Sequence, residues 1–322
     1  MDICTLGEMV VDFTPVGKSK NGNTIYEQNP GGAPANVACA AARLNADAAI
    51  ITMLGRDPFG VCLGETLKKC GVCMDGVRYS SEKTGLAVIT LSEAGDRSFV
   101  FYRNPCADQM LSEDDVSLDL IDQCKIFHFS SVSLASEISA KATLYALNHA
   151  KGKGRLVSFD INYRKMLAAD ITSYNERIRD VLPSVDILKV SEEEALIFSG
   201  LEDIEEAAAH YCRLGAKLVV ITLGPKGCYY LYDKLSGYVP AYDLKAVDTT
   251  GAGDSFVAAM LARFVALEKS LSGLEQEDIT GILEYANAAG SICSSRYGTI
   301  SAMASHEEIV NCLNNIEKLV LD

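Results

Sequence analysis

Two kinds of apolar pattern recur along this chain of 322 residues. Short, nearly continuous apolar runs are typical of strands buried on both faces of a parallel sheet. Such runs occupy residues 2–9, 48–54, 126–130, 155–161, 185–190 and 217–222. Segments with helical spacing cover residues 137–150, 279–295 and 306–321. Because strand and helix patterns alternate from residue 125 onward, the sequence predicts an α/β fold with a mostly parallel central sheet.

One part of the chain departs from this alternation. Residues 85–92 and 97–102 alternate apolar and polar positions on either side of the turn-forming sequence 93–96, and no helix separates them. This pattern predicts a β-hairpin. We expect one domain over residues 1–322, with a small β-lid built from about residues 10–30 and 84–106. A lid over a binding site would exclude water from the reaction beneath it.

The stretch 248–256, Asp-Thr-Thr-Gly-Ala-Gly-Asp-Ser-Phe, stands where a loop turns into a helix. After it, apolar residues recur at helical spacing: Phe256, Val257, Met260, Leu261, Phe264 and Leu267. Gly251, Ala252 and Gly253 therefore lie at a helix N-terminus, where free N–H groups and the helix dipole favour an anion. Asp254 places a carboxylate inside the same anion-binding turn.

Two interpretations of Asp254 compete at this point. It can be an ordinary acidic residue in a first helical turn. It can also be a general base that accepts the proton of an attacking hydroxyl while the neighbouring amides hold a phosphoryl group. The stretch is not a Walker A loop, since no Gly-Lys-Ser/Thr follows, and it lacks the third glycine of a dinucleotide fingerprint. These nine residues leave both interpretations open.

Polar residues also follow two of the first predicted elements. Asp12 lies just beyond the first apolar run, where open α/β sheets place ligand contacts. Gly31 and Gly32 allow close backbone approach before an alanine-rich helix, on which Asn36 offers both a donor and an acceptor suited to sugar hydroxyls. A plain helix start would explain the second stretch equally well.

Later strands end in similar polar positions. Asp160, Asn162 and Arg164 follow the run 155–161, and they fit either a surface loop or a binding crevice. Ser191 with the acids that follow it is ordinary N-cap chemistry. Glycines after residue 222 suggest close approach of a ligand such as a nucleotide.

The composition of the chain limits the kinds of partner and the cellular location that we expect. The net charge of −14 argues against nucleic acid or an anionic membrane as a partner. No apolar run approaches the ~20 residues of a membrane span, and the eleven cysteines without a signal peptide predict a cytoplasmic protein with reduced thiols. For Cys70 and Cys73, the one Cys-x-x-Cys pair, packing is the preferred interpretation. The four histidines show no metal-binding spacing.

Two stretches of this chain together resemble the PfkB/ribokinase family of carbohydrate kinases: Gly31-Gly-Ala-Pro-Ala-Asn36 and Asp248-Thr-Thr-Gly-Ala-Gly-Asp254. They stand in the family's order and separation, and the resemblance covers essentially the whole chain. It implies a ribokinase-like three-layer α/β/α fold and ATP-dependent phosphorylation of a sugar. The stretches 7–13, 101–105 and 159–164 most resemble fructokinases, which implies conversion of fructose to fructose 6-phosphate.

The resemblance also implies a role for each matching position. Asp254 would be the catalytic base, and the amides of Gly251, Ala252 and Gly253 would form the anion hole. The sugar would be held by Asp12, Gly31, Gly32, Asn36, Arg103 and Arg164. ATP would lie along Ser191, Thr222, Gly224, Gly227 and Asn287. Glu194 would orient water on Mg²⁺, and a monovalent cation, usually K⁺, would be surrounded by Asp248, Thr250 and Gly298.

Some alternatives remain open. Many family members have Asn-x-x-Glu where this chain has Ser191-Glu-Glu-Glu194, so the role of Ser191 is in doubt. A 2-keto-3-deoxygluconate kinase would use the same scaffold, with Arg103 or Arg164 facing the acid group of the sugar. A catalytically silent sugar or nucleotide sensor is the alternative from a different class. The edges of a β-lid also suggest a homodimer formed through it.

Overall fold

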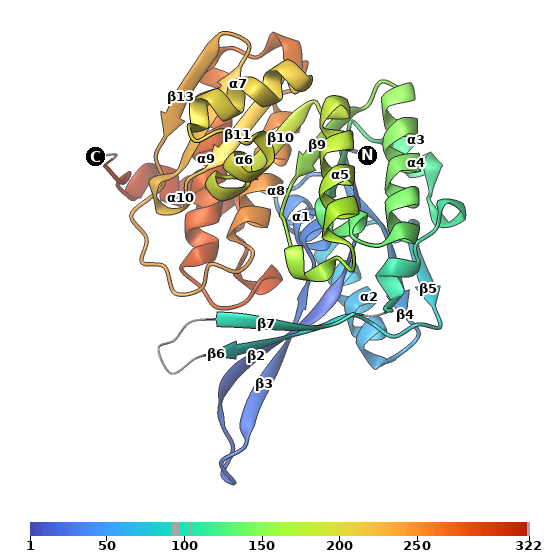
Figure 1. The fold of residues 1–322 in the computed structure, drawn as a ribbon. Helices are drawn as coiled ribbons and strands as arrows, with labels where there is room; N and C mark the ends of the chain where they lie inside the picture. Colours follow the sequence, from blue (N-terminus) through green and yellow to red (C-terminus); the bar gives the residue numbers. More distant parts are fainter. Residues whose placement is uncertain (92–96, 104, 321–322) are drawn as a thin grey trace.

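The computed structural model describes residues 1–91, 97–103 and 105–320. In this part of the chain a layered body carries a second, smaller sheet that projects from one end (Figure 1). The main sheet has nine strands in the order β13-β12-β11-β10-β9-β8-β1-β4-β5. All pairs from β11 to β5 are parallel, and β12 and β13 add an antiparallel hairpin at one edge. The predicted mostly parallel sheet is confirmed.

The strands coincide closely with the apolar runs of the sequence. They are β1 (Ile3–Leu6), β4 (Ala48–Gly55), β5 (Val77–Ser80), β8 (Ile126–Ser130), β9 (Leu156–Asp160), β10 (Ile187–Ser191), β11 (Leu218–Thr222), β12 (Cys228–Tyr232) and β13 (Leu235–Val239). The central strand β1 pairs with β4 on one side and β8 on the other. The strand order therefore reverses at β1, and ligands of open α/β sheets bind beyond the carboxyl ends of the strands at such a point.

Helices cover both faces of the main sheet (Figure 1). They are α1 (Ala33–Arg43), α2 (Pro58–Cys70), α3 (Leu118–Gln123), α4 (Glu137–Gly152), α5 (Ile171–Val181), α6 (Glu192–Ser199), α7 (Ile204–Leu214), α8 (Ala252–Ala266), α9 (Gln276–Ser294) and α10 (His306–Asn315). Because side chains alternate along a strand, Ile187 packs in the apolar core with α8 and α9, whereas Leu188 packs in the core with α4 and α7. The body is thus a three-layer α/β/α arrangement.

The second sheet has four strands in the order β3-β2-β6-β7. Its strands are β2 (Val10–Lys18), β3 (Thr24–Gly31), β6 (Leu86–Leu91) and β7 (Arg97–Tyr102). β6 and β7 pair antiparallel as the alternating pattern predicted, whereas the predicted turn 93–96 lies outside the described residues. Phe13 of this sheet meets Phe59 of α2 edge to face, with ring centroids 5.7 Å apart. This aromatic contact ties the small sheet to the body.

One boundary predicted from the sequence is wrong. The predicted helix 306–321 ends at Asn315, and the following residues run extended beside Tyr242, with which Lys318 forms a β-bridge. The Leu319 amide donates to the Ala241 carbonyl over 2.8 Å, so tertiary pairing overrides the helical pattern.

The cysteines of the chain are all free thiols. Cys73 lies in an isolated bridge beside Ala49 of β4, and Cys70 ends α2 and packs on the core that α2 shares with α1. The Cys-x-x-Cys pair thus has the packing environment that was preferred for it. Among the described helices, none combines the length and the apolarity that crossing a membrane would require.

Candidate active site

Asp254 occupies the first turn of α8 and is only 8% exposed. Two amide side chains donate to its carboxylate: Asn36 Nδ2 to Oδ2 over 2.7 Å and Asn162 Nδ2 to Oδ1 over 3.3 Å. Burial raises the pKa of Asp254 above its ordinary value, although the Asn36 hydrogen bond and the positive charges of Lys189 and Arg164 oppose the rise. The structure therefore gives this carboxylate a buried site and two fixed donors.

Asn36 reaches Asp254 because of the way α1 begins. Gly32 caps the helix with a φ of +108°, and a Cβ at this position would lie 2.5 Å from the Glu8 carbonyl oxygen. Only glycine fits this close crossing of two backbones. Glu8 Oε1 then accepts the Ala33 amide over 2.9 Å, which satisfies one of the free N–H groups at the start of α1. The helix start predicted at this stretch therefore also positions the buried side chain of Asn36.

Asp12 comes to the same place from β2 of the small sheet. Its Oδ2 lies 2.3 Å from where a Cβ of Gly31 would stand, so a side chain at position 31 would displace the carboxylate. Burial and the charge of Asp254 raise the pKa of Asp12 to about 6, and Arg103 and Arg164 act in the opposite direction. The predicted sugar-binding carboxylate and the predicted base thus lie within electrostatic reach of one another.

The two predicted arginines differ in their surroundings. Arg103 is buried and forms an ion pair with Asp108, whereas Arg164 is exposed and donates to the neighbouring Tyr163 carbonyl. Burial raises the pKa of Glu8 to about 7, even though the Arg103 guanidinium opposes this change. Arg103 therefore has structural partners in addition to any ligand, and Arg164 is the more accessible of the two.

The glycine-rich loop before α8 has the geometry of a helix start. Gly251 has a φ of +77°, and its Cβ would lie 2.6 Å from Thr299 Cγ2. The Ala252 amide donates to the Thr249 carbonyl over 3.2 Å, so one of the three predicted anion-hole amides already has a partner within the turn. A Cβ on Gly253 would lie 3.2 Å from Lys189 Nζ, which places a buried ammonium beside this turn.

The predicted nucleotide residues are spread along the ends of β10 and β11. Ser191 caps α6, its Oγ accepts the Glu194 amide over 3.3 Å, and Glu194 Oε2 accepts the Ser191 amide over 2.9 Å. Glu194 Oε1 also accepts the Tyr163 amide over 2.6 Å. Thr222 Oγ1 donates to the Val190 carbonyl over 3.3 Å. The carboxylate of Glu194, which accepts hydrogen bonds from the Ser191 and Tyr163 amides, keeps further acceptor capacity for a bound water.

Three further predicted nucleotide residues also have internal roles. Gly224 has a φ of +59° with open space around its missing Cβ, whereas a Cβ on Gly227 would lie 2.1 Å from the Val239 carbonyl oxygen. Asn287 Nδ2 donates to the same oxygen over 2.9 Å. Gly227 and Asn287 therefore join β12, β13 and α9, and of the three only Gly224 is free of packing constraints.

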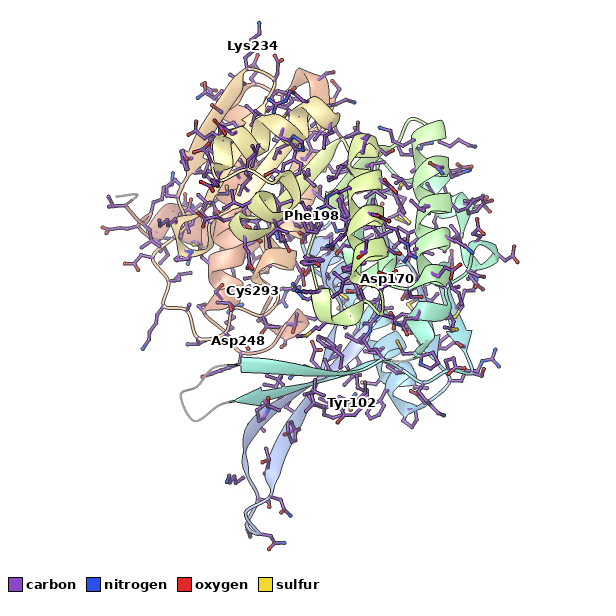
Figure 2. All side chains as sticks on the ribbon, viewed as in Figure 1. Tyr102, Asp170, Phe198, Lys234, Asp248 and Cys293 are labelled. Carbon is purple, nitrogen blue, oxygen red and sulfur yellow. The ribbon has the colours of Figure 1, made fainter. Side chains whose placement is uncertain are left out.

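The predicted cation residues gather between the 248–251 loop and the end of α9. Asp248 is buried, its Oδ1 accepts the Thr250 amide over 2.9 Å, and its own amide donates to the Ser294 carbonyl over 3.1 Å. Gly298, with a φ of +96°, belongs to the turn that follows. Asp248 and Cys293 lie at the end of the body from which the small sheet projects (Figure 2). No cluster of three acidic, histidine or cysteine ligands occurs among the described residues.

Two buried groups at this site, Lys189 and Glu8, were not predicted from the sequence, and Asn162 was predicted only as part of a surface loop or a binding crevice. Asn162, with a φ of +42°, donates to Asp254, and Lys189 pairs with Asp160. Glu8 supports α1. Asn162 and Lys189 lie at the carboxyl ends of parallel strands, and Glu8 follows shortly after the end of β1, so position along the sheet was the available signal. Which of these side chains turn toward Asp254 depends on the packing of distant segments.

A buried carboxylate at a helix start, beyond the carboxyl edge of a parallel sheet and beside a second small sheet, is the site of a ribokinase-like kinase. The model of the pfkB family carbohydrate kinases matches residues 1–306, and the chain belongs to this family. It is an ATP-dependent sugar kinase.

Individual relatives agree over nearly their whole length. "Probable fructokinase-5" of Arabidopsis thaliana is 42% identical over 306 residues, which cover 94% of each chain. The structure of a fructokinase with bound ATP from Xylella fastidiosa matches with a TM-score of 0.91 at 30% identity, over 97% of this chain and 98% of that one. A fructokinase from Vibrio cholerae O395, in a form with fructose, ADP and calcium ion, matches with a TM-score of 0.88 at 31% identity, over 97% and 99%.

Proposed function

We propose that this kinase transfers the terminal phosphoryl group of ATP to fructose and forms fructose 6-phosphate. The observation that carries the proposal is the placement of Asp254, a buried carboxylate held by Asn36 at the N-terminus of α8. The similarity to proteins named fructokinases supports fructose as the sugar. No relative cited here is named for 2-keto-3-deoxygluconate or for a silent sensor, so those alternatives gain no support.

In this proposal Asp254 accepts the proton of the sugar hydroxyl as the new bond forms. Phosphoryl transfer needs alignment and charge stabilisation more than covalent chemistry, so a carboxylate fixed by two amides suits the task. Asp12 and Asn36 would orient the sugar, with Gly31 and Gly32 allowing its close approach and Arg103 and Arg164 supplying positive charge. The amides of Gly251 and Gly253, at the positive end of the α8 dipole, would stabilise the transferring group.

The residues also fit ATP and a divalent ion. Gly224 leaves open space beside the end of β11, which suits the close approach of a nucleotide, and Ser191, Thr222, Gly227 and Asn287 would form the surrounding edge. Bound Mg²⁺ would neutralise phosphate charge in the usual manner of kinases. Glu194 retains acceptor capacity for a metal-bound water, since magnesium commonly keeps several of its waters.

A monovalent cation fits the loop before α8. The loop offers the buried carboxylate of Asp248 and the backbone oxygens of Thr250 and of the turn at Gly298, and backbone carbonyl oxygens can replace the hydration shell of K⁺. The ion would stabilise the loop that precedes the anion hole. We therefore propose K⁺ as an activator that acts by ordering this loop.

A homodimer through the small sheet is a further part of the proposal. Tyr26, Val100 and Tyr102 are exposed apolar side chains on this sheet, and Tyr102 is 63% exposed. Strand register places Val100 on the face of Phe13, opposite to the face that carries Asp12. Pairing of two such faces would cover these side chains while leaving Asp12 turned toward the site.

The test is release of ADP by the purified protein with ATP, Mg²⁺ and K⁺. The sugar panel contains fructose, 2-keto-3-deoxygluconate, ribose and fructose 6-phosphate. We expect fructose to be turned over, and Asp254→Asn to lose about 10²-fold or more in kcat while still binding fructose and ATP. Asp243→Asn, an exposed aspartate on the approach to the same loop, is the matched control. Preference for another sugar would overturn the substrate, and an unchanged rate in Asp254→Asn would overturn the base.

A further inference from the structure

Lys189 is a buried lysine near the carboxyl end of β10. Its Nζ lies 3.1 Å from Asp160 Oδ1 and 3.3 Å from Oδ2, and Asp160 ends the neighbouring strand β9. Both side chains of this pair are less than a tenth exposed. Burying such a pair carries a desolvation cost that its attraction only partly offsets, so its presence beneath a site calls for an explanation.

The position of the ammonium is electrostatically unusual. Gly253 stands in the first turn of α8, and its absent Cβ would lie only 3.2 Å from Lys189 Nζ. The N-terminal end of a helix carries partial positive charge, which disfavours a nearby cation. Three carboxylates within electrostatic reach of the ammonium compensate this: Asp160, Glu194 and Asp254. Burial alone would lower the pKa of Lys189, but these carboxylates outweigh burial and keep the ammonium charged.

We propose that Lys189 is a positioning residue of the kinase reaction, which fixes the first turn of α8 and keeps Asp254 in its carboxylate form, while Asp160 holds the ammonium away from direct contact with Asp254. This inference rests on the proposed role of Asp254 as the base. It goes beyond that role by assigning a task to two buried charged groups, Lys189 and Asp160, that neither bind the sugar nor belong to the glycine loop.

The geometry explains why both members are needed. An ammonium has three donors, and two of them are directed at the oxygens of Asp160. Asp254 has its own neutral donors in Asn36 and Asn162, so its carboxylate is fixed without an ion pair. A direct bond from Lys189 to Asp254 would lower the basicity of the carboxylate. Lys189 therefore supplies positive potential to Asp254 without a direct bond, and the charge of Asp160 reduces this potential.

Other polar and charged groups also surround Asp254 and influence its titration. They are Asp12 on β2, Asn36 on α1, Asp160 at the end of β9, Asn162 and Arg164 after β9, Lys189 on β10, Glu194 on α6 and Cys293 on α9. Of the cations, Arg164 is exposed and therefore screened by solvent, whereas Lys189 is buried. Removal of Lys189 is thus expected to have the larger effect.

The experiment compares Lys189→Met, Lys189→Arg and the double variant Asp160→Asn/Lys189→Met. The double variant removes both members of the ion pair, so neither member is left unpaired and the variant remains informative if the single variant fails to fold. Lys151→Met is the matched control, because Lys151 pairs over 3.3 Å with Asp186, a buried aspartate just before the start of β10. Readouts are the melting temperature, KM and kcat for fructose, and the pH profile of kcat/KM.

We expect Lys189→Met and the double variant to lose roughly tenfold or more in kcat with little change in KM. The acid limb of the pH profile of Lys189→Met should move to higher pH by about one unit or more, as expected on loss of a nearby opposite charge. The double variant should show a smaller shift in the same direction, because it also loses the Asp160 charge, which repels Asp254. Lys189→Arg should restore the position of the limb, and Lys151→Met should leave both readouts unchanged.

An unchanged acid limb in folded Lys189→Met, or in the double variant if Lys189→Met does not fold, would overturn the inference and make the pair purely structural. A loss of rate that only follows a loss of folded protein would do the same. Asp254→Asn separates this failure from a failure of the proposed function. If Asp254→Asn is inactive while the Lys189 variants keep the wild-type profile, only the inference about Lys189 is wrong.

Discussion

Asn36 and Asp254, separated by 218 positions in the chain, are joined by a buried hydrogen bond of 2.7 Å between the amide of one and the carboxylate of the other. The bond connects α1 with α8, so the two stretches that define the family in the sequence meet in one site. The Asn36 Oδ1 atom is buried and has no hydrogen-bond partner among the described residues, so it is available to accept a hydrogen bond from a ligand hydroxyl.

Asn36→Ala should reduce the catalytic efficiency of the kinase more than it reduces the stability of the fold. The change removes a donor to a buried carboxylate, a bond to a charged group worth about 1.5–3 kcal/mol, and leaves the pKa of Asp254 higher. We expect a lower kcat/KM for fructose whose acid limb lies at higher pH. Asn175→Ala on α5 removes an amide that does not contact Asp254, and it serves as the control in the same pH series. Equal profiles for the two variants would contradict the prediction.

The affinity for fructose should depend on pH through Asp12. Burial and the nearby charge of Asp254 raise the pKa of this carboxyl to about 6, so Asp12 becomes protonated as the pH falls through that value. If the carboxylate accepts sugar hydroxyls, KM should rise below about pH 6 and stay level above it. Measurement of KM from pH 5 to 8 tests this, and Asp12→Asn should give a high KM that no longer changes across the same interval.

Gly251→Ala should destabilise the loop before α8. Its φ of +77° is unfavourable for a residue with a side chain, and the new Cβ would lie 2.6 Å from Thr299 Cγ2. We expect a loss of about 1–3 kcal/mol in the free energy of unfolding by urea titration, from backbone strain and the contact combined. Gly281→Ala is the matched control, since Gly281 lies inside α9 with open space around it and should gain up to about 1 kcal/mol. Similar values for both variants would contradict this account.

Asp57 links the start of α2 to the small sheet. Its Oδ1 accepts the Gly60 amide over 2.9 Å, and its Oδ2 accepts the Thr84 amide over 2.8 Å just before β6. Asp57→Ala should therefore cost about 1–2 kcal/mol of stability as a lost helix cap, and it should also increase hydrogen exchange in β6. Asp170→Ala, which removes the cap of α5, should destabilise without any effect on β6.

The stabilisation by Asp57 depends on pH because folding lowers the pKa of this carboxyl group. Partial burial of Asp57 raises its pKa, but the hydrogen bonds from Thr84 and Gly60 outweigh burial and hold the pKa below the ordinary value. Its stabilisation is therefore fully present above the ordinary pKa of an aspartate and is lost as the pH falls through the lower folded value. The difference between wild type and Asp57→Ala should accordingly shrink in strong acid, which urea titrations at several pH values would measure.

Much of the fold follows from local patterns. The apolar runs at 126–130 and 217–222 match β8 and β11 within one residue, because a strand buried on both faces is apolar at most of its positions. The helix start at Gly251 was also readable, since small residues before an amphipathic run are a local signal. By contrast, α10 ends at Asn315 because residues after it pair with the segment at Tyr242, which no local pattern reveals.

The sequence by itself determined the class of fold, the order of the strands along the chain and the identity of the residues expected to carry the chemistry, since periodicity and short motifs depend only on neighbours. Only the tertiary structure decided which side chains meet. Asp254 receives its donors from Asn36 and Asn162, and Lys189 pairs with Asp160, because parallel strands and distant helices bring these atoms to one edge of the sheet. Burial, and with it the pKa of each carboxyl group, arises from that packing and has no counterpart in the linear chain.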